Sequence, residues 1–155
     1  GFDRKEPTRV SRYPVVTVVV IPDSDSPLPL PDERFLRQVR RNIESRRIIG
    51  TLVRISGPVY IPLDIRIEAI VSGRVQITDV EEKIKSTLAP GNHRRIGDSV
   101  FEGDIESAVC EIDEILSVTR IEISTGMPEC YKDAYGYLEI PSDGVTWLRN
   151  LKFRS

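Results

Sequence analysis

The clearest pattern along the chain is a strict alternation of apolar and polar positions over residues 59–72. One set of alternate positions, which we call the apolar parity, is aliphatic throughout and consists of Val59, Ile61, Leu63, Ile65, Ile67, Ala69 and Val71. The other set, the polar parity, is mostly polar, with Asp64, Arg66 and Glu68 at its centre. Because successive side chains of a strand point to opposite faces, this period predicts a long strand with one face on a core and the other in water. Pro62 lacks an N–H group, so we expect the early part of this strand at a sheet edge or bulge.

Two shorter strands are predicted before it. Residues 15–21 are almost all β-branched and end at Pro22, which is typical of a central strand that is buried on both faces. Residues 51–55 are predicted to form a short strand that leads through the turn 56–58 into the long one.

Helical spacing and capping residues predict three helices. The first is expected to begin at Pro31, to end at Gly50 and to bury a stripe formed by Phe35, Leu36, Val39 and Ile43. The second is expected to begin at a capping box, Thr78 to Glu81, and to end at Pro90-Gly91. The third should begin near Asp104, after a polar loop over residues 92–103.

The order of these elements predicts the fold class. A strand over 118–123 completes a β-α-β-β-α-α-β series, which indicates an α+β domain with a split βαβ (ferredoxin-like) sheet and helices on one face. We expect residues 1–13 to be a lead-in and residues 14–123 to form the domain. Residues 124–155 should contribute a loop and a closing pair of strands, at 137–140 and 148–153, to the same domain.

Composition limits the function classes. The 155 residues are 39% hydrophobic and 30% charged, which is typical of a soluble globular protein. The formal net charge of −2 gives no overall attraction to nucleic acid or to an anionic membrane, and no apolar run is long enough to cross a bilayer. Two cysteines without C-x-x-C spacing favour a reducing compartment over a disulfide framework.

No pattern in the sequence indicates catalysis, a cofactor or a metal. The one histidine, His93, has no nearby acidic or cysteine partner, so it is expected to be a solvated loop residue. The acidic loop 97–104 lacks the ligand spacing of an EF-hand and is expected to be a turn followed by a helix cap. Cys110 and Cys130 are expected to be passive small residues rather than reactive thiols. We therefore expect a protein that is not an enzyme.

The first helix is rich in arginine, and two interpretations of this remain open. Six arginines lie mostly off its apolar stripe: Arg34, Arg37, Arg40, Arg41, Arg46 and Arg47. They are expected to form a solvated face that makes salt bridges within or between subunits, with Arg37 and Arg41 as interface candidates. RNA binding is the alternative, although the open face of the long strand offers Asp64, Arg66 and Glu68 where RNA-binding sheets carry stacking aromatics. A regulatory small-ligand ferredoxin-like domain is a further alternative.

The order of several segments resembles the C-terminal region of baseplate J-like proteins, the wedge components of contractile phage tails. The resemblance covers roughly residues 14–153. It rests on the strand 16–22 that ends in proline, the helix end 44–51, the strand-proline-tyrosine segment 53–65, the glycine-containing loop 96–105, the segment 115–121 that leads from a helix into a strand, and the closing strands 138–141 and 148–153. Ser117 stands where that family commonly has a glycine before its valine, so the turn there is expected to differ.

The resemblance implies a structural role in a virion or phage-tail-like baseplate, assembled in the bacterial cytoplasm. It implies partners among the other wedge subunits and copies of the chain itself, and it carries over no active site and no cofactor. From the residues, the interface candidates are the late aromatics Tyr131, Tyr135, Tyr137 and Trp147, because tyrosine and tryptophan are enriched at binding hot spots. The alternative for Tyr137 and Trp147 is that they cover the open end of the domain's own core.

Overall fold

The structure is a computed structural model that describes residues 14–46, 50–91 and 93–155, so the predicted lead-in at residues 1–13 lies outside the described part. The chain divides into two compact units, Gly1–Gly57 and Pro58–Ser155, which we call the N-terminal unit and the C-terminal unit.

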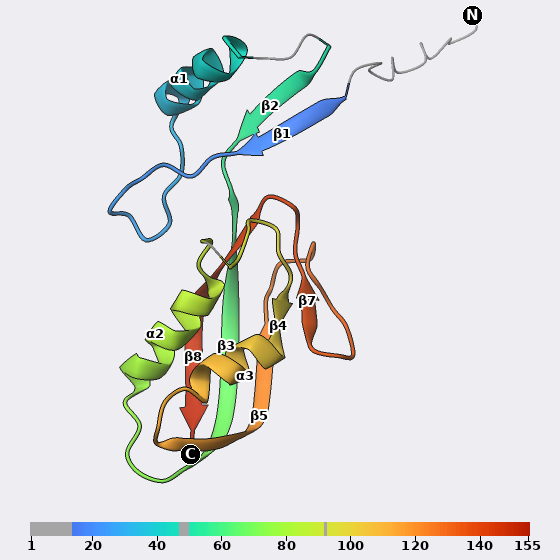
Figure 1. Cartoon of the computed structure of the whole chain (residues 1–155). Coiled ribbons are helices and arrows are strands. Elements are labelled where there is room, and N and C mark those ends of the chain that lie inside the picture. The colour runs from blue at the N-terminus through green and yellow to red at the C-terminus, as the bar shows by residue number, and fades with distance from the viewer. Residues whose placement is uncertain (1–13, 47–49, 92) are drawn as a thin grey trace, which may run out of the picture. The chain divides into compact units, whose positions relative to one another are not determined.

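The N-terminal unit is a β-α-β element (Figure 1). Strand β1 (Val15–Val19) and strand β2 (Leu52–Ser56) pair in parallel, and helix α1 (Glu33–Glu44) connects them. The prediction of a central strand here is wrong, because within the described residues β1 pairs with β2 alone. Its apolar sequence is therefore only partly covered, and Val15 and Val16 are 51% and 47% exposed.

Helix α1 begins two residues later than expected. Asp32 is the N-cap, and its carboxylate accepts a hydrogen bond from the backbone N–H of Phe35 at 2.7 Å. This bond satisfies one of the free N–H groups of the first turn, which is why the helix starts at Glu33 rather than Pro31. The predicted stripe packs only in part, since no residue of α1 is fully buried.

The C-terminal unit is built on a three-stranded sheet in the order β5-β3-β8. Its central strand β3 (Val59–Val71) runs antiparallel to β5 (Ile115–Ser124) and parallel to β8 (Gly144–Arg154). The pairing with β5 starts at Asp64, so Pro62 has a strand on one side only, the side of β8. The prediction that the early part of this strand lies at an edge is confirmed.

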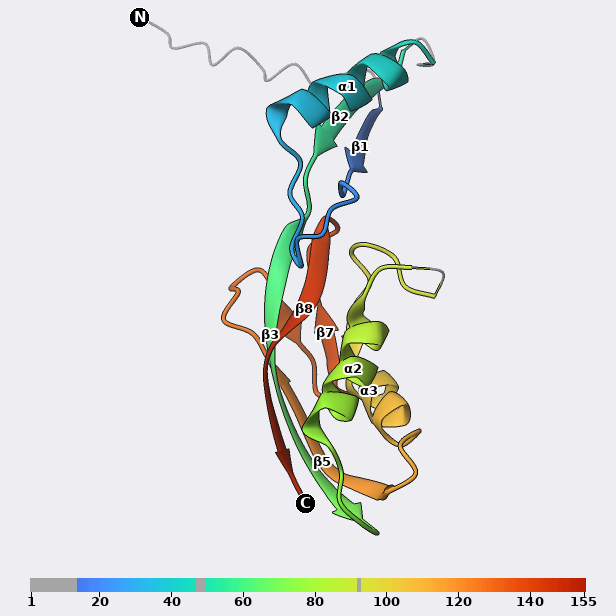
Figure 2. The ribbon, with the colours of Figure 1, turned by 90° about the vertical axis from the view of Figure 1, so that its left-hand side faces the viewer.

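Helices α2 (Ile77–Leu88) and α3 (Glu102–Val109) cover one face of this sheet (Figure 2). The predicted apolar parity of β3 faces them, and Ile61, Leu63, Ile65 and Ile67 are at most 2% exposed. The core is completed by Val80, Ile84, Leu88, Ile105, Val109 and Ile123, all at most 2% exposed. The opposite face of the sheet, which we call the open sheet face, carries the polar parity of β3.

A second, smaller sheet has the order β4-β7-β6 and consists of β4 (Val100–Phe101), β7 (Tyr137–Glu139) and β6 (Tyr131–Lys132). Both β4 and β6 are two-residue strands within segments predicted to be loops. Strands this short carry no readable periodicity, and their pairing is decided by where the core holds β7. Leu138 of β7 is 3% exposed and anchors the small sheet in the core.

The α+β class is confirmed, whereas the predicted arrangement of strands is wrong. The predicted single ferredoxin-like sheet is divided into separate sheets, with β1 and β2 in one and β3 in another. The predicted closing pair does not form either, because β8 pairs with β3 while β7 pairs with β4 and β6. The capping box at Thr78 is also wrong: α2 begins at Ile77, and its N-cap, Gln76, makes no side-chain capping bond.

Candidate protein–protein interface

The small sheet presents aromatic side chains on its outer side. In the register, Phe101 lies opposite Tyr137, and Tyr131 lies opposite Glu139 on the other edge of β7. Because Leu138 points into the core, its neighbours along β7 point outward, and the residues paired with those neighbours share that side. We call this surface the aromatic face and define it as Phe101, Tyr131, Tyr135 and Tyr137, with Tyr135 in the turn between β6 and β7.

Most of the aromatic face is open to solvent. Tyr131, Tyr135 and Tyr137 are 66%, 83% and 44% exposed. Tyr137 stacks on Phe101 with ring centroids 4.4 Å apart, so the least exposed tyrosine is held in place by its neighbour. Exposed tyrosines on a pinned backbone offer large contact area with little loss of conformational entropy on binding.

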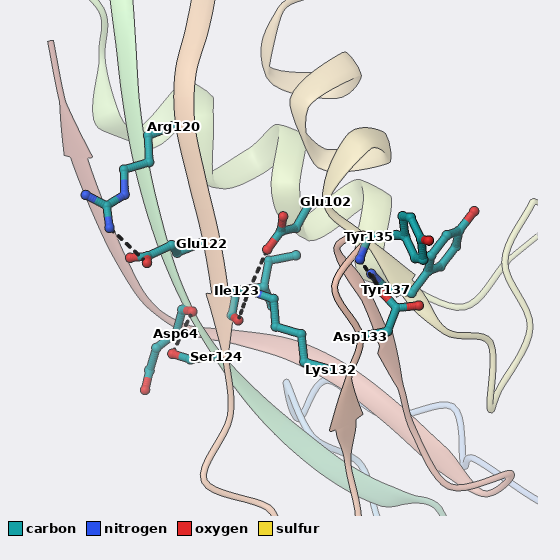
Figure 3. Close-up of polar contacts among 10 residues, drawn as sticks. All are labelled: Asp64, Glu102, Arg120, Glu122, Ile123, Ser124, Lys132, Asp133, Tyr135 and Tyr137. Carbon is teal, nitrogen blue, oxygen red and sulfur yellow. Dashed lines mark hydrogen bonds and ion pairs between the residues drawn. The ribbon is translucent and has the colours of Figure 1, made fainter.

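The turn that carries Tyr135 is fixed by Asp133. Its carboxylate oxygen Oδ1 accepts hydrogen bonds from the backbone N–H groups of Tyr135 at 2.8 Å and Tyr137 at 3.0 Å (Figure 3). The N–H of Asp133 in turn donates to the carbonyl of Tyr137 at 2.9 Å. Gly136 has a φ of 85°, a backbone conformation that favours glycine.

An ion pair ties the small sheet to the rest of the C-terminal unit. Lys132 Nζ lies 2.6 Å from Glu102 Oε1 and also donates a hydrogen bond to the carbonyl of Ile123 on β5 at 3.2 Å. The side chain of Glu102 is 19% exposed, and its backbone N–H donates to the carbonyl of Gly136 at 2.9 Å. This partly buried pair therefore holds β6 and the tyrosine turn against α3 and β5.

The sequence predicted the tyrosines of this site but not the residues that position them. Phe101, Glu102 and Lys132 become neighbours of the tyrosines only through the pairing of β4, β7 and β6. Asp133 carried a readable signal, because aspartate ahead of a glycine-containing segment is typical of a turn closed by the carboxylate.

The other predicted interface residues lie elsewhere. Trp147 is on β8 opposite Pro62, on the face of the sheet away from the helices, and it is half-buried. Arg37 and Arg41 are exposed on α1 of the N-terminal unit, and Arg37 Nε donates to the carbonyl of Glu33 at 3.4 Å. The structure therefore places three of the six candidates on one surface and the other three on two different surfaces.

A hollow of about 960 Å³ in the C-terminal unit lies between α2, α3 and the loop after α2. Both of its basic side chains other than His93 have partners: Lys83 pairs with Glu111 at 2.9 Å, and Arg94 donates to the carbonyls of Asp98 at 2.6 Å and Ser99 at 3.0 Å. Burial lowers the pKa of the Arg94 guanidinium. These contacts serve to hold the loop rather than to present converging groups to a ligand.

Residues 14–46, 50–91 and 93–155 offer little other chemistry. In that part of the chain no group of three or more His, Cys, Asp or Glu side chains is placed to hold a metal ion. No helix of the same residues has the length and apolar character to span a bilayer. Burial and the neighbouring Glu129 raise the pKa of the Cys130 thiol, which disfavours the reactive thiolate.

An ion pair on the open sheet face lowers the pKa of Asp64. Arg149 donates to both carboxylate oxygens of Asp64, with Nε 3.0 Å from Oδ1, and this hydrogen bonding lowers the pKa of Asp64, with a smaller contribution from Lys152. The stabilisation from Asp64 is therefore present above the unfolded pKa and is lost as the pH falls through the lower folded pKa. In a carbon-detected NMR titration we expect Asp64 to titrate at a lower pH than an ordinary aspartate. Arg149→Gln should raise this pKa more than the control Lys152→Gln does, and equal shifts would contradict the assignment.

Comparison with known proteins gives a similar fold. No protein-family model matches the sequence, and no curated protein matches it. Among solved structures, a chain of the cryo-EM structure of the anti-feeding prophage baseplate, 6-fold symmetrised, has a similar fold with a TM-score of 0.61 and 16% sequence identity. The match covers 96% of this chain and 32% of that chain, so this protein spans about a third of the length of the chain that it matches.

Proposed function

We propose that this chain is a structural component of the baseplate of a contractile phage-tail-like particle and that it acts through protein–protein interfaces. The observation that carries the proposal is the similarity of fold, over 96% of the chain, to part of a baseplate protein. The order of segments in the sequence resembles that of baseplate J-like wedge proteins. This resemblance supports the same role without reference to the fold. We infer that the chain corresponds to one region of a wedge subunit of that kind.

The arrangement of residues supports a scaffold better than an enzyme. Lys83 and Arg94, which line the hollow between α2 and α3, are used in structural contacts. In contrast, Asp133 holds the backbone of Tyr135 and Tyr137, and the side chains of both tyrosines are exposed to solvent. Such a surface suits a contact with another subunit.

We propose the aromatic face as the contact of this chain with another baseplate subunit. The structural neighbour comes from a baseplate that is symmetrised sixfold, and a component of such an assembly needs contacts that fix its orientation. Rigid aromatic side chains provide this because few rotamers are lost when they are buried.

Incorporation into particles tests this proposal. The protein should co-purify with contractile particles when its own gene cluster is expressed. We expect the double variant Tyr131→Ala/Tyr135→Ala to reduce incorporation at least tenfold, measured by quantitative mass spectrometry of purified particles. Thermal unfolding of the isolated chain should be unchanged, because both side chains are more than half exposed.

The matched control is Leu30→Ala, which removes a 63% exposed side chain from the segment before α1, in the N-terminal unit. It should leave incorporation at the wild-type level. Absence of the wild-type protein from purified particles would refute the baseplate role. Normal incorporation of the double variant would refute the aromatic face as the contact.

A further inference from the structure

We propose that the open sheet face of one copy of this chain binds the helix layer of a second copy, in a head-to-tail contact between basic and acidic surfaces. This inference rests on the proposed baseplate role and names two surfaces of the C-terminal unit that the role leaves unassigned. The two surfaces lie on opposite sides of the same sheet (Figure 2).

The open sheet face has an excess of positive charge. The strand register places four cations on this face, Arg66, Arg120, Lys152 and Arg154. Arg149, at the register shift of β8, is a fifth, because it donates hydrogen bonds to Asp64. The register places three carboxylates there, Asp64, Glu68 and Glu122. Two of these carboxylates are held in ion pairs. Asp64 pairs with Arg149, and Glu122 pairs with Arg120 at 3.0 Å, as Figure 3 shows. The cations of this face outside these two ion pairs are Arg66, Lys152 and Arg154, and the one carboxylate outside them is Glu68.

Two of the remaining cations oppose each other. Arg66 of β3 lies directly across from Lys152 of β8, and like charges in that position destabilise a sheet. Both residues also contribute to the field that lowers the pKa of the neighbouring carboxylates, Lys152 at Asp64 and Arg66 at Glu122. An acidic partner bound here would relieve the repulsion between Arg66 and Lys152, and this favours the binding of carboxylates.

The same face has a hollow and apolar surface beside the charges. A hollow of about 520 Å³ is lined by Arg66, Lys132 and Lys152 together with Asp64 and Glu122. Ile70 and Leu116, which are 53% and 63% exposed, lie further along β3 and β5. Charge can therefore orient the partner while apolar contact contributes affinity.

The helix layer of the same unit is strongly acidic. Seven exposed carboxylates lie on α2, on α3 and in the turn that follows α3: Asp79, Glu82, Asp104, Glu106, Glu111, Asp113 and Glu114. The lysines of these segments are Lys83, which pairs with Glu111, and Lys85. This acidic helix layer is complementary in sign to the open sheet face, so a second copy offers the partner that the face requires.

A contact between two different surfaces has a consequence for assembly. Each copy uses its open sheet face for one neighbour and its acidic helix layer for the next, so the contact is heterologous and repeats until the rotation closes a ring. The aromatic face takes no part in this contact and stays available for another subunit.

Charge reversal tests the proposal in the isolated chain. The sheet variant is Lys152→Glu/Arg154→Glu. The helix variant is Glu82→Lys/Glu106→Lys/Asp113→Lys/Glu114→Lys, which leaves three of the seven carboxylates against six lysines and so makes the helix layer basic. The control is Arg34→Glu/Arg40→Glu, which changes the net charge as the sheet variant does but on α1. Sedimentation velocity should show concentration-dependent self-association of the wild type that weakens at least tenfold from about 0.05 M to about 0.5 M salt. The control should associate like the wild type.

The decisive measurement mixes the two variants. Each variant alone has two surfaces of like sign and should remain monomeric, while an equimolar mixture should associate again because the acidic sheet of one now meets the basic helices of the other. Thermal unfolding verifies that each variant is folded. A wild type that stays monomeric, or single variants that associate normally, or a mixture that stays monomeric, would overturn this inference. Incorporation into particles would still test the baseplate role separately.

Discussion

Ile67→Ala is expected to lower the free energy of unfolding by about 2–5 kcal/mol. Ile67 has 0% exposure on the central strand of the three-stranded sheet, packed in the core that the sheet forms with α2 and α3. Truncation to alanine loses the burial of the side chain and leaves a cavity that the surrounding strands cannot close. Urea unfolding followed by circular dichroism measures the effect as a lower midpoint at an unchanged slope.

Ile70→Ala is the matched control, because it makes the same truncation three residues further along the same strand. Ile70 is 53% exposed on the opposite side of the sheet, so its truncation should change the free energy of unfolding by about 0.5 kcal/mol or less. Similar losses for the two variants would mean that the two faces of β3 are not buried as the structure has them.

Gly136→Ala is expected to cause a smaller but still large loss of stability and to act on the aromatic face. Its φ of 85° costs an alanine about 1–2 kcal/mol. An added Cβ would also lie 2.7 Å from Glu102 Oε2, so the carboxylate that pairs with Lys132 would have to move. We expect lower stability in urea unfolding together with a changed environment of Tyr137, visible in NMR spectra of the aromatic side chains.

Gly126→Ala is the control for this substitution. Gly126 lies in the loop before β6, it has no positive φ, and an added Cβ would meet nothing within 4 Å. Its replacement should leave stability within about 0.5 kcal/mol of the wild type. If Gly136→Ala were equally harmless, the turn that presents Tyr135 would not require glycine, and the aromatic face would be less firmly held than we propose.

The predictions that succeeded were local or periodic. The alternation over residues 59–72 predicted both the strand and the face that it buries, and the long apolar parity is the centre of the core. The starts of the three helices were predicted to within two residues from apolar spacing and capping residues, whereas α1 ends at Glu44, six residues before the expected end at Gly50. The capping residues themselves were predicted less well, because the side chain that caps a helix is selected by its three-dimensional surroundings. Asp32 caps α1, whereas the expected capping box at Thr78 does not form.

Local sequence was therefore enough to predict the α+β class, the buried face of β3, and the identity of the tyrosines that form the aromatic face. These follow from periodicity and side-chain chemistry, which act over a few residues. Local sequence did not predict that β1 pairs with β2 apart from β3, or that β8 returns from the C-terminus to pair with β3 in parallel. Nor did it predict that Arg66 faces Lys152 and that Glu102 reaches Lys132. Strand pairing and side-chain contacts between segments distant in sequence depend on the packing of the whole core, so a local sequence pattern does not predict them.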